Sequence, residues 1–408
     1  MSEQAWLSKS EVNSLFYNRV AGEILFATEG RWGYHPGAVA NLIVHQAAAL
    51  GKRSVRVLEI GANNCAFAGD LLEALRERAR DGVSKLERVD YLAVEFARNS
   101  LEAAIARVEQ GELPGTLRRA PAPAPSTEPP EKPTLIALVT TDRPHPVNLG
   151  LVHADALQFV HSTTESFDFV ILNELLDDLP CHVFYADAGG RQLEAVPAAR
   201  AENGGWRVRV RPEPAVAELE DLPAGGVTAR SGECVELVTS VARLLPPGGV
   251  LLVHDYGFAE PHLDVALYSP LQEQVPAFVA MEFPRGSENG FPRSFFRVFG
   301  NDRWKVVQVT NDVNFAELAA ALEDQGAVTV LGHGSMIYNR RGHFERGDGV
   351  FLSEFGLLGA RDDLPALLDD LHENQKELRD RFVRDYLDGR ASAFMDLIFV
   401  KGRAPRGT

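Results

Sequence analysis

Acidic and amide side chains stand at the ends of four apolar runs in this chain, where buried strands would finish. These groups are Glu59 with Gly61, then Glu95, then Asp155, and lastly Asn173 with Glu174. The carboxyl ends of parallel strands meet at one edge of an α/β sheet, and ligands bind outside that edge. Carboxylates placed there can accept hydrogen bonds from sugar hydroxyls or take up a proton during a reaction. The pattern therefore predicts a ligand site built from strand ends.

The first of these strand ends is the stretch around which the chain is organised. An apolar run from Val55 to Ile60 leads into Gly61, and apolar residues return at helical spacing from Phe67 to Leu72. This pattern predicts a buried parallel strand that feeds a helix, the opening unit of a nucleotide-binding sheet. Gly61 would let a ligand approach the backbone closely. An ordinary turn without a ligand is the alternative.

The second strand end favours the ligand. Residues 88–95 are expected to form a strand, and its final acid is Glu95. Glu95 stands about as far beyond the glycine turn as the carboxylate that binds ribose in nucleotide-binding folds. A carboxylate accepts hydrogen bonds from both hydroxyls of a vicinal diol, which few other side chains can do. Asp155, at the end of a third strand within 149–156, continues the pattern.

Reacting groups are densest after the fourth run, where Glu174, Asp177 and Asp178 occur within five residues of one another. A strand terminus is where an α/β enzyme presents its reacting groups, so these carboxylates are candidate catalytic residues. In the alternative, Asn173 caps the following helix and the two aspartates face solvent.

A fifth run, residues 250–253, ends in His254, Asp255 and Tyr256. Asp255 is the fourth candidate catalytic residue. His254 and Tyr256 would matter if the reacting group were a hydroxyl or carboxylate of a small molecule, because either could then act as a general base.

Composition restricts the classes of protein that remain. The chain has 408 residues, of which 45% are hydrophobic and 24% charged, as in soluble globular proteins, and its formal net charge is −16. This charge disfavours a nucleic-acid partner. The three cysteines are scattered without metal-ligand spacing, so we expect no metal site and a reducing compartment. The apolar runs are too short for a signal peptide or a membrane span, which predicts a cytoplasmic protein without a membrane partner.

The order of patterns along the chain predicts a core with several additions. We expect an N-terminal helical layer over the cofactor side (1–54), a Rossmann-like core (55–182 and 232–257) with a proline-rich insertion (112–148), a β-hairpin excursion (183–231), a substrate-side loop or lid (258–312), and a C-terminal part of the core (313–408). The insertion is expected to be exposed and to form neither a helix nor a central strand. A final strand near 394–400 is expected to be antiparallel at the sheet edge.

Several motifs together resemble the MidA-like family of class I S-adenosylmethionine (SAM) methyltransferases, which includes the mitochondrial complex I assembly methyltransferases. The matching stretches are Leu58–Gly61 with Gly69–Leu72, Val94-Glu95 with Ser100-Leu101, Asn173–Pro180, Asp255–Gly257, Val309–Phe315 and Phe351–Leu358. The block Asn-Glu-x-x-Asp-x-Leu-Pro is the most specific of them, because generic methyltransferases lack it.

The resemblance implies an α/β fold with a seven-stranded Rossmann-like sheet, its last strand antiparallel, and a helical and β-hairpin substrate module. It implies SAM as cofactor and dimethylation of a protein arginine as the activity. It places the methionine end of SAM at Gly61 and its neighbours Glu59, Ala62 and Asn63, the ribose at Glu95, and the adenine at Asp155 and Ala156; Asn173 is a further cofactor residue. The sequence departs from the family in one loop, where residues 62–65 replace the usual glycines.

Two other functions stay open at this stage. A methyltransferase of the same fold could act on a small molecule, since the altered loop and the segment 258–300 differ enough to allow a new substrate. A non-catalytic descendant could bind a partner protein. An NAD-dependent dehydrogenase is disfavoured, because no Gly-x-Gly-x-x-Gly motif follows the first strand.

Overall fold

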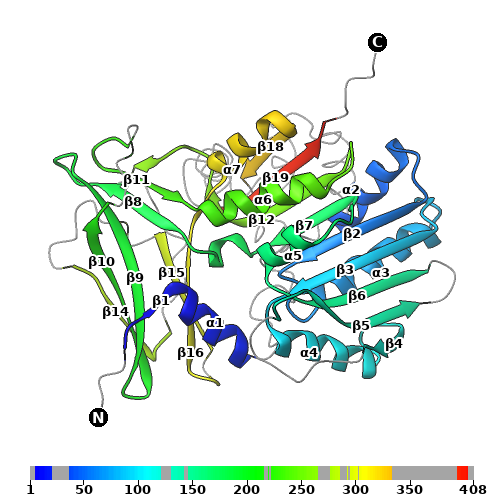
Figure 1. Ribbon diagram of the computed structural model, residues 1–408, viewed down its shortest axis with the longest axis horizontal. Coiled ribbons are helices and arrows are strands. Elements are labelled where there is room, and N and C mark those ends of the chain that lie inside the picture. Colours follow the sequence, from blue (N-terminus) through cyan, green and yellow to red (C-terminus); the bar gives the residue numbers. More distant parts are fainter. Residues whose placement is uncertain are drawn as a thin grey trace, which may run out of the picture.

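The computed structural model describes residues 5–20, 36–120, 130–141, 146–215, 219, 222–264, 276–284, 292, 295–301, 303–332 and 393–402. Within these residues the chain forms a large mixed sheet with helices on both faces and a smaller sheet beside it (Figure 1). A two-stranded hairpin and one helix lie between the two sheets.

Seven strands of the large sheet form the expected core. In spatial order they are β18 (Gly326–Gly332), β19 (Ala393–Lys401), β12 (Val250–Phe258), β7 (Phe169–Asn173), β2 (Ser54–Ile60), β3 (Arg88–Glu95) and β6 (Val147–His153). From β12 to β6 the neighbours are parallel, whereas β19 is antiparallel to both of its neighbours. The predicted fold class, with its antiparallel last strand, is confirmed.

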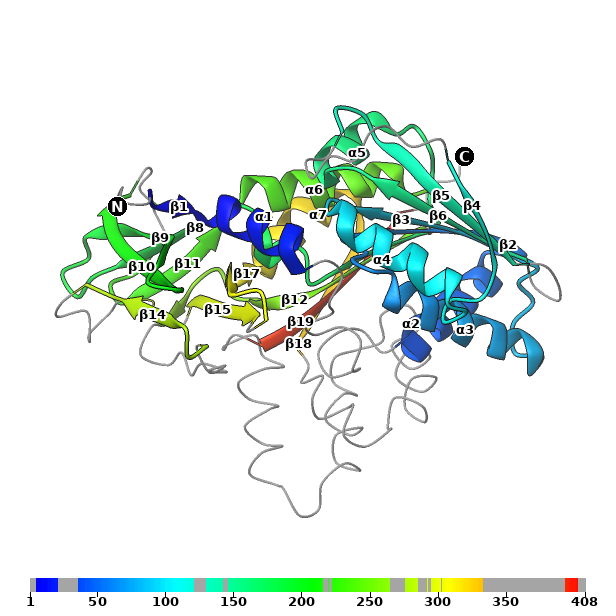
Figure 2. The same cartoon turned by 90° about the horizontal axis from the view of Figure 1, so that it is seen from below.

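The central strand β2 is apolar because both of its faces are covered. Val55 and Val57 pack into the core on one face, and Leu58 and Ile60 into the core on the other. The helices form two layers: α2 (Pro36–Ala49), α3 (Ala66–Arg80) and α4 (Arg98–Glu109) cover the first face, and α5 (Ala156–Ser162), α6 (Gly232–Leu244) and α7 (Phe315–Leu322) cover the second (Figure 2).

Local sequence explains where these helices bury their side chains and where they begin. Phe67, Leu71 and Leu75 of α3 are buried at a spacing of four residues, which places them on one face of the helix. Helix α6 begins after Ser231, whose hydroxyl accepts a hydrogen bond of 3.1 Å from the Cys234 amide and so acts as an N-cap.

The last strand lies inside the sheet and not at its edge, so this prediction was wrong. Strand β19 pairs with β12 on one side and with β18 on the other. Ile398 packs into one face's core, and Met395 and Leu397 pack into the other. An apolar run predicts that a strand is buried. Which strands it pairs with depends on the tertiary arrangement of the rest of the chain.

The proline-rich insertion adds strands at the opposite edge. Strands β4 (Thr116–Arg119) and β5 (Thr134–Thr141) continue the sheet antiparallel beyond β6. Ile136 and Val139 of β5 are buried against the core. The expectation of an exposed insertion is wrong for residues 134–141, because β5 is paired on both sides, by β4 and by β6, and the prolines of the segment lie outside both strands. Residues 121–129 and 142–145 lie outside the described ranges.

The smaller sheet gathers segments from three regions of the sequence. Its strands are β13 (Leu263–Asp264), β11 (Gly226–Arg230), β8 (His182–Ala186), β9 (Gln192–Glu202), β10 (Gly205–Pro214) and β14 (Val279–Glu282), with β1 (Leu7–Ser8) paired to β9. Asn203 and Gly204 join β9 to β10 with φ of 50° and 79°. Two residues with positive φ are typical of the tight turn that the Asn-Gly pair favours in hairpins.

The segment 258–312 contains strands where the sequence suggests a loop or lid. Besides β13 and β14 it forms β15 (Phe296–Asn301) and β16 (Val306–Asn311), which pair as an antiparallel hairpin. Strand β17 (Val313–Asn314) and the turn η4 (Glu323–Gln325) follow. These strands are short and separated by irregular stretches, so no alternating period stands out in the sequence.

The N-terminal helices do not form one layer. Helix α1 (Lys9–Val20) contacts β16 and lies between the two sheets, on the expected cofactor side (Figure 1). Helix α2 packs instead on α3 at one face of the large sheet. Its side chains Val39, Leu42, Ile43 and Ala47 are buried there, whereas His45 is exposed.

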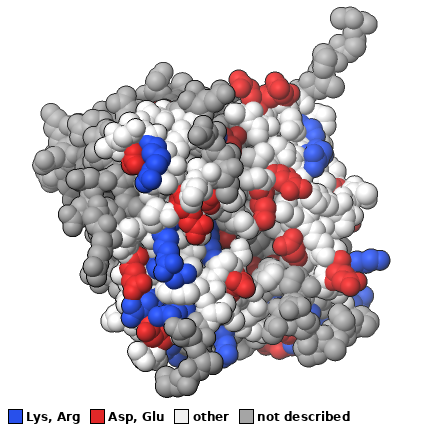
Figure 3. Space-filling model, turned by 60° about the vertical axis from the view of Figure 1, so that its left-hand side comes forward, with Lys and Arg blue, Asp and Glu red and all other residues white. Residues whose placement is uncertain are grey.

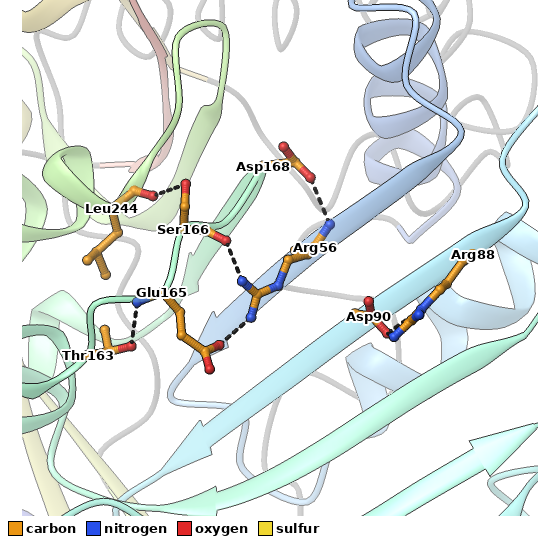
Figure 4. Close-up of polar contacts among 8 residues, drawn as sticks. All are labelled: Arg56, Arg88, Asp90, Thr163, Glu165, Ser166, Asp168 and Leu244. Carbon is orange, nitrogen blue, oxygen red and sulfur yellow. Dashed lines mark hydrogen bonds and ion pairs between the residues drawn. The ribbon is translucent and has the colours of Figure 1, made fainter.

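Charged residues near the amino ends of β2 and β7 join these two strands, at the opposite end of β2 from Gly61. The Arg56 amide donates to Asp168 at 2.9 Å, and the Arg56 guanidinium donates to the Ser166 carbonyl at 3.0 Å and pairs with Glu165 (Figure 4). Ser166 Oγ in turn donates to the Leu244 carbonyl at 3.0 Å. These contacts have a structural role.

Acidic and basic side chains lie interspersed on the face of the molecule that Figure 3 shows. The net charge of −16 is therefore not gathered into one acidic region there. No helix in the described ranges combines the length and the apolar composition needed to cross a membrane.

Candidate functional site

A cavity of about 480 Å³ opens at the carboxyl ends of β2, β3, β6 and β7. Residues of α1 and of the β15–β16 hairpin also line it. This volume suits a nucleotide-sized ligand. Except for Asp255, all the predicted site residues line the cavity: Glu59, Gly61, Ala62, Asn63, Glu95, Asp155, Ala156, Asn173, Glu174, Asp177 and Asp178.

The turn after β2 keeps a backbone shape that glycine usually provides. Gly61 has φ of 79°, and a Cβ there would lie 3.1 Å from a methyl carbon of Leu175. Asn63 and Cys65 also have positive φ, at 47° and 58°. Asparagine tolerates this region better than most residues, so the left-handed positions survive without glycine. Residues 62–65, which replace the usual glycines, therefore change the side chains of the turn. The turn still lines the cavity.

Glu95 is held at the cavity by the backbone on either side of it. Its Oε2 accepts a hydrogen bond from the Asn63 amide at 2.8 Å, and its Oε1 accepts one from the Ala97 amide at 2.7 Å. Burial raises the pKa of this carboxyl, although the backbone hydrogen bonds oppose the shift. Each oxygen keeps a second lone pair. Glu95 can therefore bind a hydroxyl pair while it supports the turn.

Glu59 is a buried acid in the same wall, 2% exposed. Its Oε2 accepts a hydrogen bond of 2.8 Å from the Tyr91 hydroxyl. Burial, together with the negative charge of Glu95, raises the pKa of Glu59 to about 8. A cationic group of a ligand would stabilise the ionised form.

Glu59 should make the stability of the ligand-free protein depend on pH. The folded protein holds the Glu59 proton up to about pH 8, whereas an unfolded glutamate loses it near 4.5. The contribution to stability is therefore complete below pH 4.5 and is lost as the pH rises towards 8. We expect the free energy of unfolding to fall by more than about 1 kcal/mol across this range, since a pKa difference of one unit corresponds to about 1.4 kcal/mol.

Urea unfolding of the wild type and of Glu59→Gln at several pH values measures this effect. The decline in the free energy of unfolding should be smaller in Glu59→Gln than in the wild type. Some decline should remain because of Asp255, whose pKa burial raises to about 7. The same decline in both proteins would show that Glu59 is not its source.

Asp155 and Asn173 follow the ends of β6 and β7, as expected. Asp155 Oδ1 accepts a hydrogen bond of 2.9 Å from the Gln158 amide, so its carboxylate caps α5. Ala156 is the first residue of that helix. Asn173 pairs with His254 across the parallel strands β7 and β12. Asp155, Ala156 and Asn173 line the cavity, whereas Gln158 and His254 do not.

The acidic turn is formed by residues 174–178, after β7. Asp178 links this turn to elements that are distant in the sequence. It lies in the 3-10 turn η2 (Leu176–Asp178), and its carboxylate accepts hydrogen bonds from Asn13 and Gln308, both at 2.8 Å, and from the Tyr17 hydroxyl. Both of its oxygens are engaged. Asp178 thus holds α1 and β16 against the cavity.

Asp177 differs from its neighbour in both burial and hydrogen bonding. The residue is 3% exposed, and its Oδ1 is buried without a hydrogen-bond partner among the described residues. Burial raises its pKa well above the ordinary value, and the charges of Asp255 and Asp178 add to the shift. A buried carboxylate oxygen of this kind can accept a hydrogen bond or a proton from a ligand.

Asp255 does not line the cavity, in contrast to the other three candidate catalytic acids. Its Oδ2 accepts hydrogen bonds from the amides of Leu176 and Asp177, at 2.7 and 3.2 Å. The carboxylate therefore positions η2. Glu174, which does line the cavity, has φ of 49°, and its amide donates to the His254 carbonyl at 2.8 Å. Non-glycine residues with positive φ are uncommon and cluster at functional sites.

The sequence left several cavity residues unassigned. Asn13 and Tyr17 of α1 are four residues apart and so share a helix face, which was a usable but weak signal. Phe299 and Gln308 of the β15–β16 hairpin carried none. Lys9, which does not line the cavity, was also missed, although its ammonium contacts the backbone of the acidic turn.

The cavity fits a cationic nucleoside derivative. Glu95 offers a carboxylate for ribose, Glu59 offers a buried acid for a positive charge, and Asn63 Oδ1 is buried without a partner among the described residues. This is the arrangement of a class I methyltransferase: the core sheet has seven strands, the last of them antiparallel. The turn after the first core strand lines the cavity, and an acidic residue ends or follows each of the next three core strands in the sequence. The chain belongs to a family of S-adenosyl-L-methionine-dependent methyltransferases, whose model matches residues 38–333. Its cofactor is SAM.

Solved structures resemble this chain at low identity. An uncharacterized protein from Burkholderia thailandensis shares 17% identity, with 98% of this chain and 88% of that chain covered and a TM-score of 0.47. A superfamily member from the same organism, bound to S-adenosyl-homocysteine, shares 16%, with 98% and 89% covered and a TM-score of 0.44. Phosphoethanolamine N-methyltransferase 2 from Haemonchus contortus shares 13%, with 89% and 52% covered and a TM-score of 0.36. No curated protein matches the sequence.

Proposed function

We propose that this methyltransferase acts on a guanidinium nitrogen of an arginine in a protein. The observation that carries the proposal is Asp177, whose buried Oδ1 has no hydrogen-bond partner among the described residues. A buried carboxylate oxygen without a donor is unfavourable, and a guanidinium supplies both N–H donors and a positive charge. Glu174 lines the same cavity and adds a second acid.

Two further considerations support a cationic acceptor. Burial raises the pKa values of Asp177, Asp178 and Asp255 despite nearby hydrogen bonds and, for Asp177 and Asp178, the charge of Lys9, so their ionised forms lack part of the compensating charge that they need. A cation bound among them would restore it. The resemblance of the 173–180 block to the MidA-like family, whose known activity is dimethylation of a protein arginine, points the same way.

The residues of the cavity would divide the work of methyl transfer. When bound, SAM supplies a methyl group on a positively charged sulfur. In-line displacement requires alignment of the acceptor and exclusion of water, and positioning of this kind can supply on the order of 7–11 kcal/mol. Glu95 would hold the ribose. Glu174 and Asp177 would orient the guanidinium, and Asp177 would take up the proton that the methylated nitrogen loses.

A small-molecule acceptor is the second candidate. Phe16, Tyr256 and Phe299 line the cavity, and the rings of Tyr256 and Phe299 are 6.4 Å apart. Aromatic walls suit a compact apolar acceptor. In that case Tyr256 would be a candidate base, and the acidic turn would serve mainly to hold α1.

Two peptide libraries that differ only in a central arginine or lysine test the proposal. The full-length protein is incubated with SAM and each library, and methylated peptides are identified by mass spectrometry. We expect methylation of arginine peptides alone. Methylation of lysine peptides would contradict the guanidinium preference. SAM binding without transfer to either library would reject an arginine peptide as the acceptor and leave a small molecule or a non-catalytic role.

A further inference from the structure

A lysine of α1 is buried beneath the acidic turn. Lys9 is 7% exposed, and its Nζ donates to the carbonyls of Asp177 and Leu179 and to Oδ1 of Asn311. The bond to Leu179 is 2.9 Å long. Three acceptors match the three protons of an ammonium group.

None of these three acceptors is a carboxylate. A buried cation normally lies in direct contact with an anion, because burial of a lone charge is unfavourable. Here the ammonium reaches the acids through space: its charge opposes the upward shift of the pKa of Asp177 and of Asp178. The arrangement places positive charge beside Asp177, and within the described part of the chain the Oδ1 of Asp177 still has no hydrogen-bond partner.

We propose that Lys9 is a positioning residue for methyl transfer, which fixes the backbone of residues 177–179 and, through its positive charge, favours the ionised form of the Asp177 carboxylate that receives the acceptor's proton. This inference rests on the proposed function. In the step concerned, a lone pair of the guanidinium nitrogen forms the N–C bond, and the S–C bond breaks with its electrons going to sulfur. The proton leaves that nitrogen for Asp177 Oδ1.

A direct ion pair between Lys9 and the Asp177 carboxylate would make Asp177 a poorer proton acceptor. If Lys9 contacted the Asp177 carboxylate, the ammonium would occupy the oxygen that the acceptor needs and would lower its basicity further. Binding the backbone of the turn leaves the side chain free while the charge remains near. Several titratable groups interact electrostatically with Asp177. They include Lys9 and Tyr17 of α1, Glu174 and Asp178 of the acidic turn, and Asp255 of β12.

A purely structural role for Lys9 predicts a different result. If Lys9 only anchors α1 to the turn, its replacement lowers stability without changing how Asp177 titrates. The positioning role predicts an upward shift in the pKa of Asp177 whenever the positive charge is removed, by about one unit or more for opposite charges at close range.

The test is an NMR titration of the full-length protein, labelled with ¹³C at aspartate carboxyls and saturated with S-adenosyl-homocysteine. The Asp177 signal is assigned by its loss in Asp177→Asn. Lys9→Gln keeps hydrogen-bond donors but removes the charge, and Lys9→Arg keeps the charge. We expect a raised pKa of Asp177 in Lys9→Gln and a value close to wild type in Lys9→Arg.

A second variant covers the case in which Lys9→Gln does not fold. Asn311→Asp places a carboxylate against the ammonium, so less positive charge remains for Asp177, and its pKa should again rise. An unchanged pKa in the folded variants would overturn the proposal. The titration requires no acceptor, so a shift in Lys9→Gln alongside unmethylated arginine peptides would uphold the role of Lys9 and reject only the arginine acceptor.

Discussion

Replacement of Asp177 by asparagine is expected to slow methyl transfer by about 100-fold or more, the scale on which loss of a general base acts. The amide keeps the size of the side chain but cannot accept the proton. Cofactor affinity should change little, because Glu95 and the turn after β2 are untouched. The measurement is the production of S-adenosyl-homocysteine under saturating SAM, with the arginine peptides as acceptor.

Stability distinguishes this result from a folding defect. Burial already disfavours the ionised form of Asp177, so the asparagine variant should unfold at an equal or higher temperature than the wild type. Asp81→Asn, at the exposed C-terminus of α3, is the matched control and should leave both activity and melting temperature unchanged. Full activity in Asp177→Asn would remove Asp177 from the mechanism.

Replacement of Glu95 by alanine is expected to weaken SAM binding by about 1.5–3 kcal/mol, the scale of hydrogen bonds to a charged group. This corresponds to roughly 10- to 150-fold in the dissociation constant. Two hydrogen bonds to ribose would be lost, and the amides of Asn63 and Ala97 would lose their acceptor. Calorimetric titration with SAM and with S-adenosyl-homocysteine measures the effect. Both ligands should weaken equally, because they share the ribose.

The same strand provides the control for Glu95. Asp90 of β3 does not line the cavity, and it accepts hydrogen bonds from Asn148 and Arg88. Asp90→Asn should therefore bind SAM like the wild type. Wild-type affinity in Glu95→Ala would mean that the ribose lies elsewhere, and melting curves of both variants would show whether loosening of the turn explains any loss.

The sequence was most informative about the cofactor half of the site. The parallel strands β2, β6, β7 and β12 are buried along most of their length and therefore form visible apolar runs, and the residue after such a run lies at the carboxyl edge of the sheet. Gly61, Glu95, Asp155 and Glu174 could be placed at the cavity for that reason. Local rules of this kind depend on a few neighbouring residues, so they can be applied without the fold.

The acceptor half of the site depends on contacts between distant segments. The adjacent acids Asp177 and Asp178 look alike in sequence. Yet Asp178 accepts hydrogen bonds from Asn13, Tyr17 and Gln308, whereas one oxygen of Asp177 has no partner among the residues that the structure describes. Asp255 ends an apolar run like the other candidates, but its carboxylate is turned to the backbone of η2. No local pattern distinguishes these environments.

The sequence by itself determined the class of fold, the cofactor turn and the strand ends that carry acids, because apolar periodicity and chain order are local properties. Only the tertiary structure decided that β19 inserts between β12 and β18, and that α1 and the β15–β16 hairpin close the cavity. It also decided that Lys9 lies beneath the acidic turn. The physical reason is that a side chain's ionisation and hydrogen bonding are set by whatever surrounds it in space, and here those surroundings come from both ends of the chain.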